Sequence, residues 1–120
     1  MKCFAFRLDA NDRIGTGHLM RCLTIANELD QNSYSCHFIC SELIQPLRFL
    51  IADKGYKYYL EDSENGVLTI LKNLNPEYLV IDHYGLDAKF ENKVYTLAKR
   101  ILVIDDMANR SHLCDFLLDQ

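Results

Sequence analysis

Two glycines and a histidine, Gly15, Gly17 and His18, are the residues best suited to do chemistry, and they lie between an apolar stretch and a helical pattern. Because glycine has no Cβ, the backbone here can closely approach a bulky or phosphate-bearing ligand. A helix that begins at Gly17 directs its unpaired N–H groups at the same ligand. The partial positive charge of a helix start disfavours imidazolium, so we expect His18 to be neutral and able to accept a proton. The segment is a candidate binding loop that carries a candidate base, with Arg21 one turn further along.

Alternating strand and helix patterns position this segment. Apolar runs predict strands at residues 3–8, 34–40, 56–60, 78–82, 100–104 and 115–118, and amphipathic patterns predict helices at 17–31, 43–54, 66–74 and 87–98. Gly55 is expected to end the second helix, and Pro76 the third. Because strands alternate with helices, we predict parallel strands joined by right-handed crossovers. The fold class is therefore α/β, a Rossmann-like three-layer sandwich with a mainly parallel sheet, formed by residues 1–120 as a single domain.

Polar residues follow the ends of several predicted strands. Asp9 follows the first strand, the segment Asp82-His83-Tyr84-Gly85 the fourth, and Asp105-Asp106 the fifth. In open parallel sheets, ligands bind outside the carboxyl ends of the strands, at the point where the strand order reverses. Strands one and four usually flank this point. We therefore expect the glycine loop and segment 82–85 to face one crevice.

The composition bounds the class of partner. Thirteen basic and seventeen acidic side chains give a net charge of −4, and no basic run is present to contact a phosphate backbone. We therefore expect no nucleic-acid partner. No stretch of about eighteen apolar residues occurs, so we expect neither secretion nor membrane insertion, and a cytoplasmic location.

The cysteines fit the same compartment. They are odd in number and scattered through mostly apolar segments, unlike the framework of a small secreted protein. Cys36 and Cys40 could share a face of one strand, but no second cysteine or histidine pair completes a zinc site. We expect ordinary buried thiols and no metal site at Cys3, Cys22, Cys36, Cys40 and Cys114.

Four ordered motifs then resemble a known family. They are Phe6-Arg7-Leu8-Asp9, residues 15–23 (GTGHLMRCL), Ile81-Asp82-His83-Tyr84-Gly85 and Asp105-Asp106. The sequence is similar to the N-terminal half of the PseG family, which hydrolyses UDP-2,4-diacetamido-2,4,6-trideoxy-β-L-altropyranose to UDP and the free sugar in pseudaminic acid biosynthesis. It is also similar to spore-coat polysaccharide proteins and, more distantly, to MurG-type glycosyltransferases.

The resemblance implies one half of a GT-B-type two-domain enzyme. Family members carry a second Rossmann-like domain of similar size, which holds most of the UDP, and the chain stops at Gln120 without it. The expected partners are therefore a nucleotide-sugar and a C-terminal UDP-binding domain. We expect residues 1–120 alone, as the acceptor or sugar-side domain, to bind nucleotide-sugar weakly and to turn over little or nothing.

The family reaction is attack of water on the anomeric carbon, with inversion and without metal or cofactor, and the motif histidine is the base. Here that histidine is His18. UDP is a good leaving group, so one base can suffice where a glycosidase also needs an acid. Arg21 is expected to reach phosphate or the Asp9 carboxylate, and Asp82 to orient hydroxyl, amide or His18 partners. The full set expected to bind substrate is Asp9, Gly15, Gly17, Arg21, Asp82, His83, Tyr84, Gly85, Asp105 and Asp106.

Three other functions remain open from the sequence. A sugar transferase would use the same histidine to activate an acceptor hydroxyl. A metal-dependent phosphoesterase would gather His18 with the carboxylates and His83 at one rim, although Asp9-Ala10-Asn11-Asp12 is a poor match to its paired-aspartate motif. A non-catalytic module would only bind nucleotide-sugar or a partner domain.

Each candidate residue also has a plainer interpretation. In this interpretation the two glycines serve only a tight turn, and His18 faces solvent at the helix start. Asp82, Asp105 and Asp106 then cap the following helices, and Tyr84 packs against a neighbouring loop. His37 is expected to be structural, His112 to be an ordinary loop residue, and residues 61–64 to form a solvated acidic loop.

Overall fold

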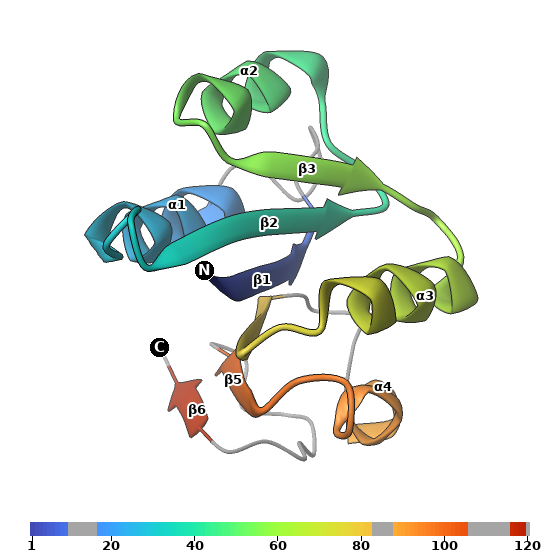
Figure 1. Cartoon of the computed structure of the whole chain (residues 1–120). Coiled ribbons are helices and arrows are strands. Elements are labelled where there is room, and N and C mark those ends of the chain that lie inside the picture. Colours follow the sequence, from blue (N-terminus) through green and yellow to red (C-terminus); the bar gives the residue numbers. More distant parts are fainter. Residues whose placement is uncertain (10–16, 83–87, 106–115, 120) are drawn as a thin grey trace.

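A parallel sheet of six strands runs through the centre of the molecule in the computed structural model, which describes residues 1–9, 17–82, 88–105 and 116–119 (Figure 1). The strand order is β3-β2-β1-β4-β5-β6, and every neighbouring pair is parallel. The strands are Lys2–Leu8 (β1), Tyr34–Cys40 (β2), Lys57–Leu60 (β3), Tyr78–Asp82 (β4), Arg100–Asp105 (β5) and Phe116–Asp119 (β6). The helices are Gly17–Glu28 (α1), Gln45–Asp53 (α2), Glu64–Leu74 (α3) and Ala88–Val94 (α4).

This strand order confirms the predicted Rossmann-like α/β fold. The chain builds β1, β2 and β3 outward in one direction, then returns to place β4 on the other side of β1. The order therefore reverses between β1 and β4, where such sheets bind ligands. Leu8 pairs in register with Asp82, so these two strands end level with each other.

Two hydrophobic clusters hold the helices against opposite faces of the sheet. Phe4, Phe6 and Leu8 of β1 pack in one cluster with residues of α1 and α2. Ala5 lies in the other cluster, with residues of α3 and α4. Successive side chains of a strand point to opposite faces, and this alternation produces the three layers.

Helix boundaries differ from the prediction in several places, and capping explains the difference in α3. Helix α3 begins at Glu64, two residues earlier than predicted, because the Ser63 hydroxyl accepts the Gly66 amide and caps the helix. Glu64 therefore belongs to the helix, and only residues 61–63 of the acidic segment form the loop. The same helix ends before Pro76, as predicted. Helices α1 and α4 end earlier than predicted, at Glu28 and Val94.

Helix α2 ends in the turn predicted at Gly55. The Gly55 amide donates to the Ala52 carbonyl, and the Tyr56 amide donates to the Ile51 carbonyl. This pair of hydrogen bonds is a Schellman motif, which requires a left-handed residue, and Gly55 has φ +80°. The turn lets Lys57 begin β3 directly afterwards.

The described cysteines are buried or half-buried free thiols, as predicted. Burial raises the pKa of Cys40 to about 12, and the pKa of Cys22 lies well above its usual range because of burial and the nearby Asp82 carboxylate. These thiols remain protonated at neutral pH. Cys114 lies outside the described residues.

Among the residues that the structure describes, no helix is both long and apolar enough to cross a membrane.

We predict that Gly55→Ala lowers the free energy of unfolding by about 1 kcal/mol, because a Cβ disfavours the left-handed conformation. Urea denaturation measures the change. Gly17→Ala is the matched control, because a Cβ there meets no described neighbouring atom within 4 Å and φ is not positive. Equal losses in the two variants would contradict the role of Gly55 in the turn.

We also predict that the thiols resist alkylation in the folded chain and make folding sensitive to alkali. Unfolded thiols ionise around pH 9.0, whereas the pKa of Cys3 and of Cys36 is raised to about 11. The unfolded chain therefore loses protons first, and the free energy of unfolding falls as pH rises above about 9. In Cys114→Ser, iodoacetamide labelling at pH 8 should be at least about tenfold slower without urea than with it. Equal rates would show that the thiols are accessible.

Candidate functional site at the carboxyl edge of the sheet

Three residues from α1 and β4 meet at the switch point of the sheet. Asp82 is the last residue of β4 and is fully buried. His18 is the second residue of α1 and is only 4% exposed. Arg21 follows one turn later, with 28% of its side chain exposed. The first turn of α1 is thereby held against the end of β4.

The Asp82 carboxylate binds both of the other side chains. Its Oδ1 is hydrogen-bonded to Nδ1 of His18. Arg21 donates from Nε to Oδ2 at 3.0 Å and from Nη2 to Oδ1 at 2.8 Å, which is a bidentate pair. Nη2 of Arg21 also lies 3.2 Å from Nδ1 of His18. The three side chains form one connected group.

This arrangement can prepare an imidazole to accept a proton. A carboxylate on Nδ1 favours the tautomer with its proton on that nitrogen, so Nε2 is then the acceptor nitrogen of the ring. The charges of Arg21 and Asp82 cancel while His18 is neutral. When Nε2 takes up a proton, the Asp82 carboxylate can stabilise the imidazolium that forms. The chemistry available to the group is general base catalysis.

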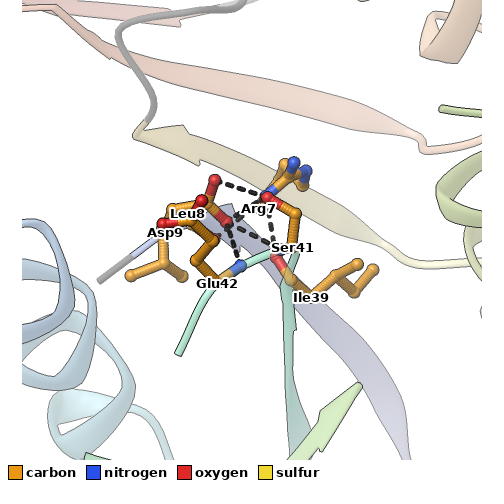
Figure 2. Close-up of polar contacts among 6 residues, drawn as sticks. All are labelled: Arg7, Leu8, Asp9, Ile39, Ser41 and Glu42. Carbon is orange, nitrogen blue, oxygen red and sulfur yellow. Dashed lines mark hydrogen bonds and ion pairs between the residues drawn. The ribbon is translucent and has the colours of Figure 1, made fainter. Parts of the chain in front are cut away.

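A second buried group, centred on Asp9, joins the ends of β1 and β2 (Figure 2). The Asp9 carboxylate accepts from Nη1 of Arg7 at 3.0 Å, and from the amide and hydroxyl of Ser41, each at 2.7 Å. The Glu42 amide donates to it at 3.2 Å. Nη1 of Arg7 also contacts the carbonyls of Leu8 and Ile39. The group fixes the start of the segment that follows β1.

The structure corrects the expected partner of Arg21. The sequence suggested phosphate or the Asp9 carboxylate, but the carboxylate that Arg21 binds is that of Asp82. Asp9 pairs instead with Arg7, which lies two residues away on the same strand. Residue spacing in the sequence could not decide between the Asp9 and Asp82 carboxylates, because β1 and β4 end at the same edge of the sheet.

One plainer interpretation is also wrong, because His18 is buried and does not face solvent. Among the described residues, the Asp82 carboxylate binds His18 and Arg21. The structural role predicted for His37 is supported, since its Nδ1 lies 2.9 Å from the Tyr59 hydroxyl and its Nε2 lies 3.0 Å from the Ser35 hydroxyl.

The structure gives the backbone position of two further predicted site residues, Gly17 and Asp105, and does not describe the others. Gly17 begins α1, and a Cβ built there has open space around it among the described residues. Asp105 ends β5, beside β4, but its side chain is not described. Outside the described residues lie Gly15, His83, Tyr84, Gly85 and Asp106, and also His112, for which the sequence predicted an ordinary loop position.

Sequence reasoning assigned no role to Arg7 or Ser41. Arg7 is a charged residue inside an apolar strand, and this signal could have indicated a buried ion pair. Ser41 gave no signal, because its role depends on how the end of β2 lies beside the end of β1.

One cavity of the structure lies away from the candidate site. A cavity of about 520 Å³ lies at the opposite edge of the sheet, beside Tyr34 and Tyr56, and none of the predicted site residues lines it. The candidate site is instead defined by the contacts of His18, Arg21 and Asp82 at the switch point of the sheet. Within residues 1–9, 17–82 and 88–104, no group of three or more His, Cys, Asp or Glu side chains is arranged to hold a metal ion.

Two curated proteins are similar in sequence to this chain. It is 29% identical over 115 residues to the UDP-2,4-diacetamido-2,4,6-trideoxy-beta-L-altropyranose hydrolase of Campylobacter jejuni, and the match covers 95% of the chain and 40% of that protein. It is 26% identical over 98 residues to an uncharacterized protein of Methanocaldococcus jannaschii, covering 82% of the chain and 20% of that protein. No family model matches. The chain thus spans less than half the length of either relative and is distantly related to part of a nucleotide-sugar hydrolase.

We predict that Asp9→Ala lowers the free energy of unfolding by about 3–5 kcal/mol, because it leaves the buried Arg7 cation without its partner. Ser41→Ala, which removes one hydrogen bond, should cost about 1 kcal/mol. Urea denaturation measures both. Removing both charges in Arg7→Met/Asp9→Asn should recover part of the loss, and a double variant no more stable than Asp9→Ala would contradict the ion-pair explanation.

Proposed function

We propose that this chain is the sugar-side half of a UDP-sugar hydrolase. The reaction releases UDP and a free 2,4-diacetamido-2,4,6-trideoxy sugar by attack of water at the anomeric carbon, with inversion. The observation that carries the proposal is the contact between Nδ1 of His18 and the buried Asp82 carboxylate at the switch point. The similarity to the Campylobacter jejuni hydrolase supports this substrate class.

His18 acts as the general base. Nε2 takes a proton from water while the water oxygen bonds to the anomeric carbon, on the face opposite UDP. The bond from this carbon to the phosphate oxygen breaks, and UDP leaves with the electron pair. Because a diphosphate leaves readily, no acid has to protonate it. Asp82 stabilises the imidazolium, and Arg21 is a positioning residue that holds Asp82 in place.

The remaining site residues have proposed roles around the sugar and the phosphates. The backbone from Gly15 to Gly17 passes close to the substrate, where side chains would obstruct it. His83, Tyr84 and Gly85 follow directly after Asp82 in the sequence and contact the sugar or its acyl-amino groups. Asp105 and Asp106 border the same edge. Asp9 acts indirectly, by joining the end of β1 to the end of β2 through Arg7 and Ser41.

The complete enzyme is proposed to have two domains of the GT-B type. A C-terminal Rossmann-like domain holds most of the UDP, and the substrate lies between it and the carboxyl edge described above. Residues 1–120 alone are then expected to bind nucleotide-sugar weakly. The fact that supports a second domain is that the chain covers 40% of its Campylobacter jejuni relative.

The test joins this chain to the C-terminal part of the Campylobacter jejuni relative and assays hydrolysis of the UDP-sugar in oxygen-18 water. We expect the label in the sugar, because the C–O bond breaks, and a loss of about 10²–10⁴ in kcat for His18→Ala. Asp82→Asn should lower kcat more than it changes KM. His37→Ala is the matched control, since His37 is a buried histidine in β2 whose two ring nitrogens are hydrogen-bonded, and it should retain activity.

Other outcomes point to other functions. Label in the phosphate together with loss of activity on adding a chelator would indicate a metal-dependent phosphoesterase. Turnover only with an added acceptor sugar would indicate a transferase. No turnover, with UDP-sugar binding retained, would indicate a binding module. Full activity in His18→Ala would remove His18 from the mechanism.

A further inference from the structure

The outer edge of β3 is open in the part of the chain that the structure describes. β3 is the last strand on one side of the sheet, so one edge has no described neighbour (Figure 1). Tyr58 and Leu60 are 37% and 44% exposed, and the adjacent helix α2 leaves Phe49 65% exposed. Soluble proteins usually protect edge strands with charges, prolines or bulges, because open edges pair with other strands. This edge carries exposed Tyr58 and Leu60 between two charged residues, Lys57 and Glu61.

The backbone groups that face outward belong to Tyr58 and Leu60. The Glu61 amide donates to the Cys40 carbonyl of β2 at 2.9 Å. Since the hydrogen-bonding direction alternates along a strand, the amides and carbonyls of Lys57 and Tyr59 also face β2. Tyr58 and Leu60 therefore present two amides and two carbonyls at the free edge.

This edge is complementary to itself in one antiparallel register. If Tyr59 of two copies face each other across a two-fold axis, Tyr58 of each copy lies opposite Leu60 of the other. These are the residues with outward backbone groups, so four hydrogen bonds form. The same register places Lys57 opposite Glu61 at both ends. If Tyr58 lies on the two-fold axis instead, Leu60 pairs with Tyr56 of the other copy. If Leu60 lies on the axis, Tyr58 pairs with Asp62. Tyr56 and Asp62 both lie outside β3.

We propose that two copies of this chain associate through their β3 edges in this register, forming a continuous sheet across the two-fold axis. A second copy is the occupant that the charges favour, because each strand supplies both the cation and the anion at matching positions. Hydrogen bonds limit the motion of the Glu61 carboxylate, since its Oε1 accepts from the amide and the hydroxyl of Ser63. Tyr58 and Leu60 gain an apolar cross-strand neighbour. The proposal goes beyond the proposed function and does not depend on it.

Sedimentation velocity over a concentration series tests the proposal. The unmodified chain should show a monomer–dimer equilibrium. Lys57→Glu and Glu61→Lys each replace two attractive pairs with two repulsive ones, so each should weaken the dimer about tenfold or more. An equimolar mixture of the two variants should form heterodimers as tight as the unmodified dimer, because every pair is again of opposite charge. Misfolding of one variant cannot produce this rescue.

Lys72→Glu on α3 is the matched control, with the same charge change away from β3, and it should leave the dimer unchanged. Hydrogen exchange adds a check of register: dimer formation should protect the amides of Tyr58 and Leu60, while those of Tyr59 and Glu61 are protected in both states. A chain that stays monomeric at every concentration would overturn the proposal. So would a dimer that Lys57→Glu and Glu61→Lys leave intact.

Discussion

The candidate site depends on the hydrogen bonds that the buried carboxylate of Asp82 makes with His18 and Arg21. It lies at the carboxyl end of β4, beside the end of β1, and it binds both His18 and Arg21 of α1. A carboxylate removed from water is costly unless hydrogen bonds and an opposite charge compensate it. Arg21 supplies the charge and His18 a further hydrogen bond, so the same contacts that make Asp82 tolerable also fix the orientation of the imidazole. The burial of Asp82 and the proposed base catalysis by His18 therefore depend on the same contacts.

The buried carboxylate of Asp9 is also compensated by hydrogen bonds and an arginine, but it joins different elements. Asp9 is buried and charged, but its described contacts are to Arg7, Ser41 and the Glu42 amide. It joins the ends of β1 and β2, whereas Asp82 joins the end of β4 to α1. Both groups lie at the carboxyl edge, where strands end and backbone amides become available. These contacts hold the strand ends on both sides of the switch point.

The elements were predictable because each has a local cause. The predicted strands 34–40 and 78–82 agree with β2 and β4, since a polar residue, Ser41 or Asp82, marks the end of each run. The end of α2 follows from Gly55, because a glycine adopts the left-handed conformation of this turn without a steric cost. The start of α3 was missed because Ser63 caps the helix two residues before its first apolar position. The sequence patterns of α1 and α4 continue past their last helical residues, Glu28 and Val94, so periodicity alone placed these ends too late.

The sequence by itself determined the alternation of strands and helices, the parallel sheet and the position of His18 at a helix start. These follow from local periodicity and from the geometry of crossover connections. Only the tertiary structure decided which carboxylate each cation binds. Arg21 pairs with Asp82, 61 residues away, and Arg7 with Asp9, two residues away. Asp9 and Asp82 follow neighbouring strands, and the direction in which each side chain leaves its strand is fixed by packing of the whole sheet against its helices.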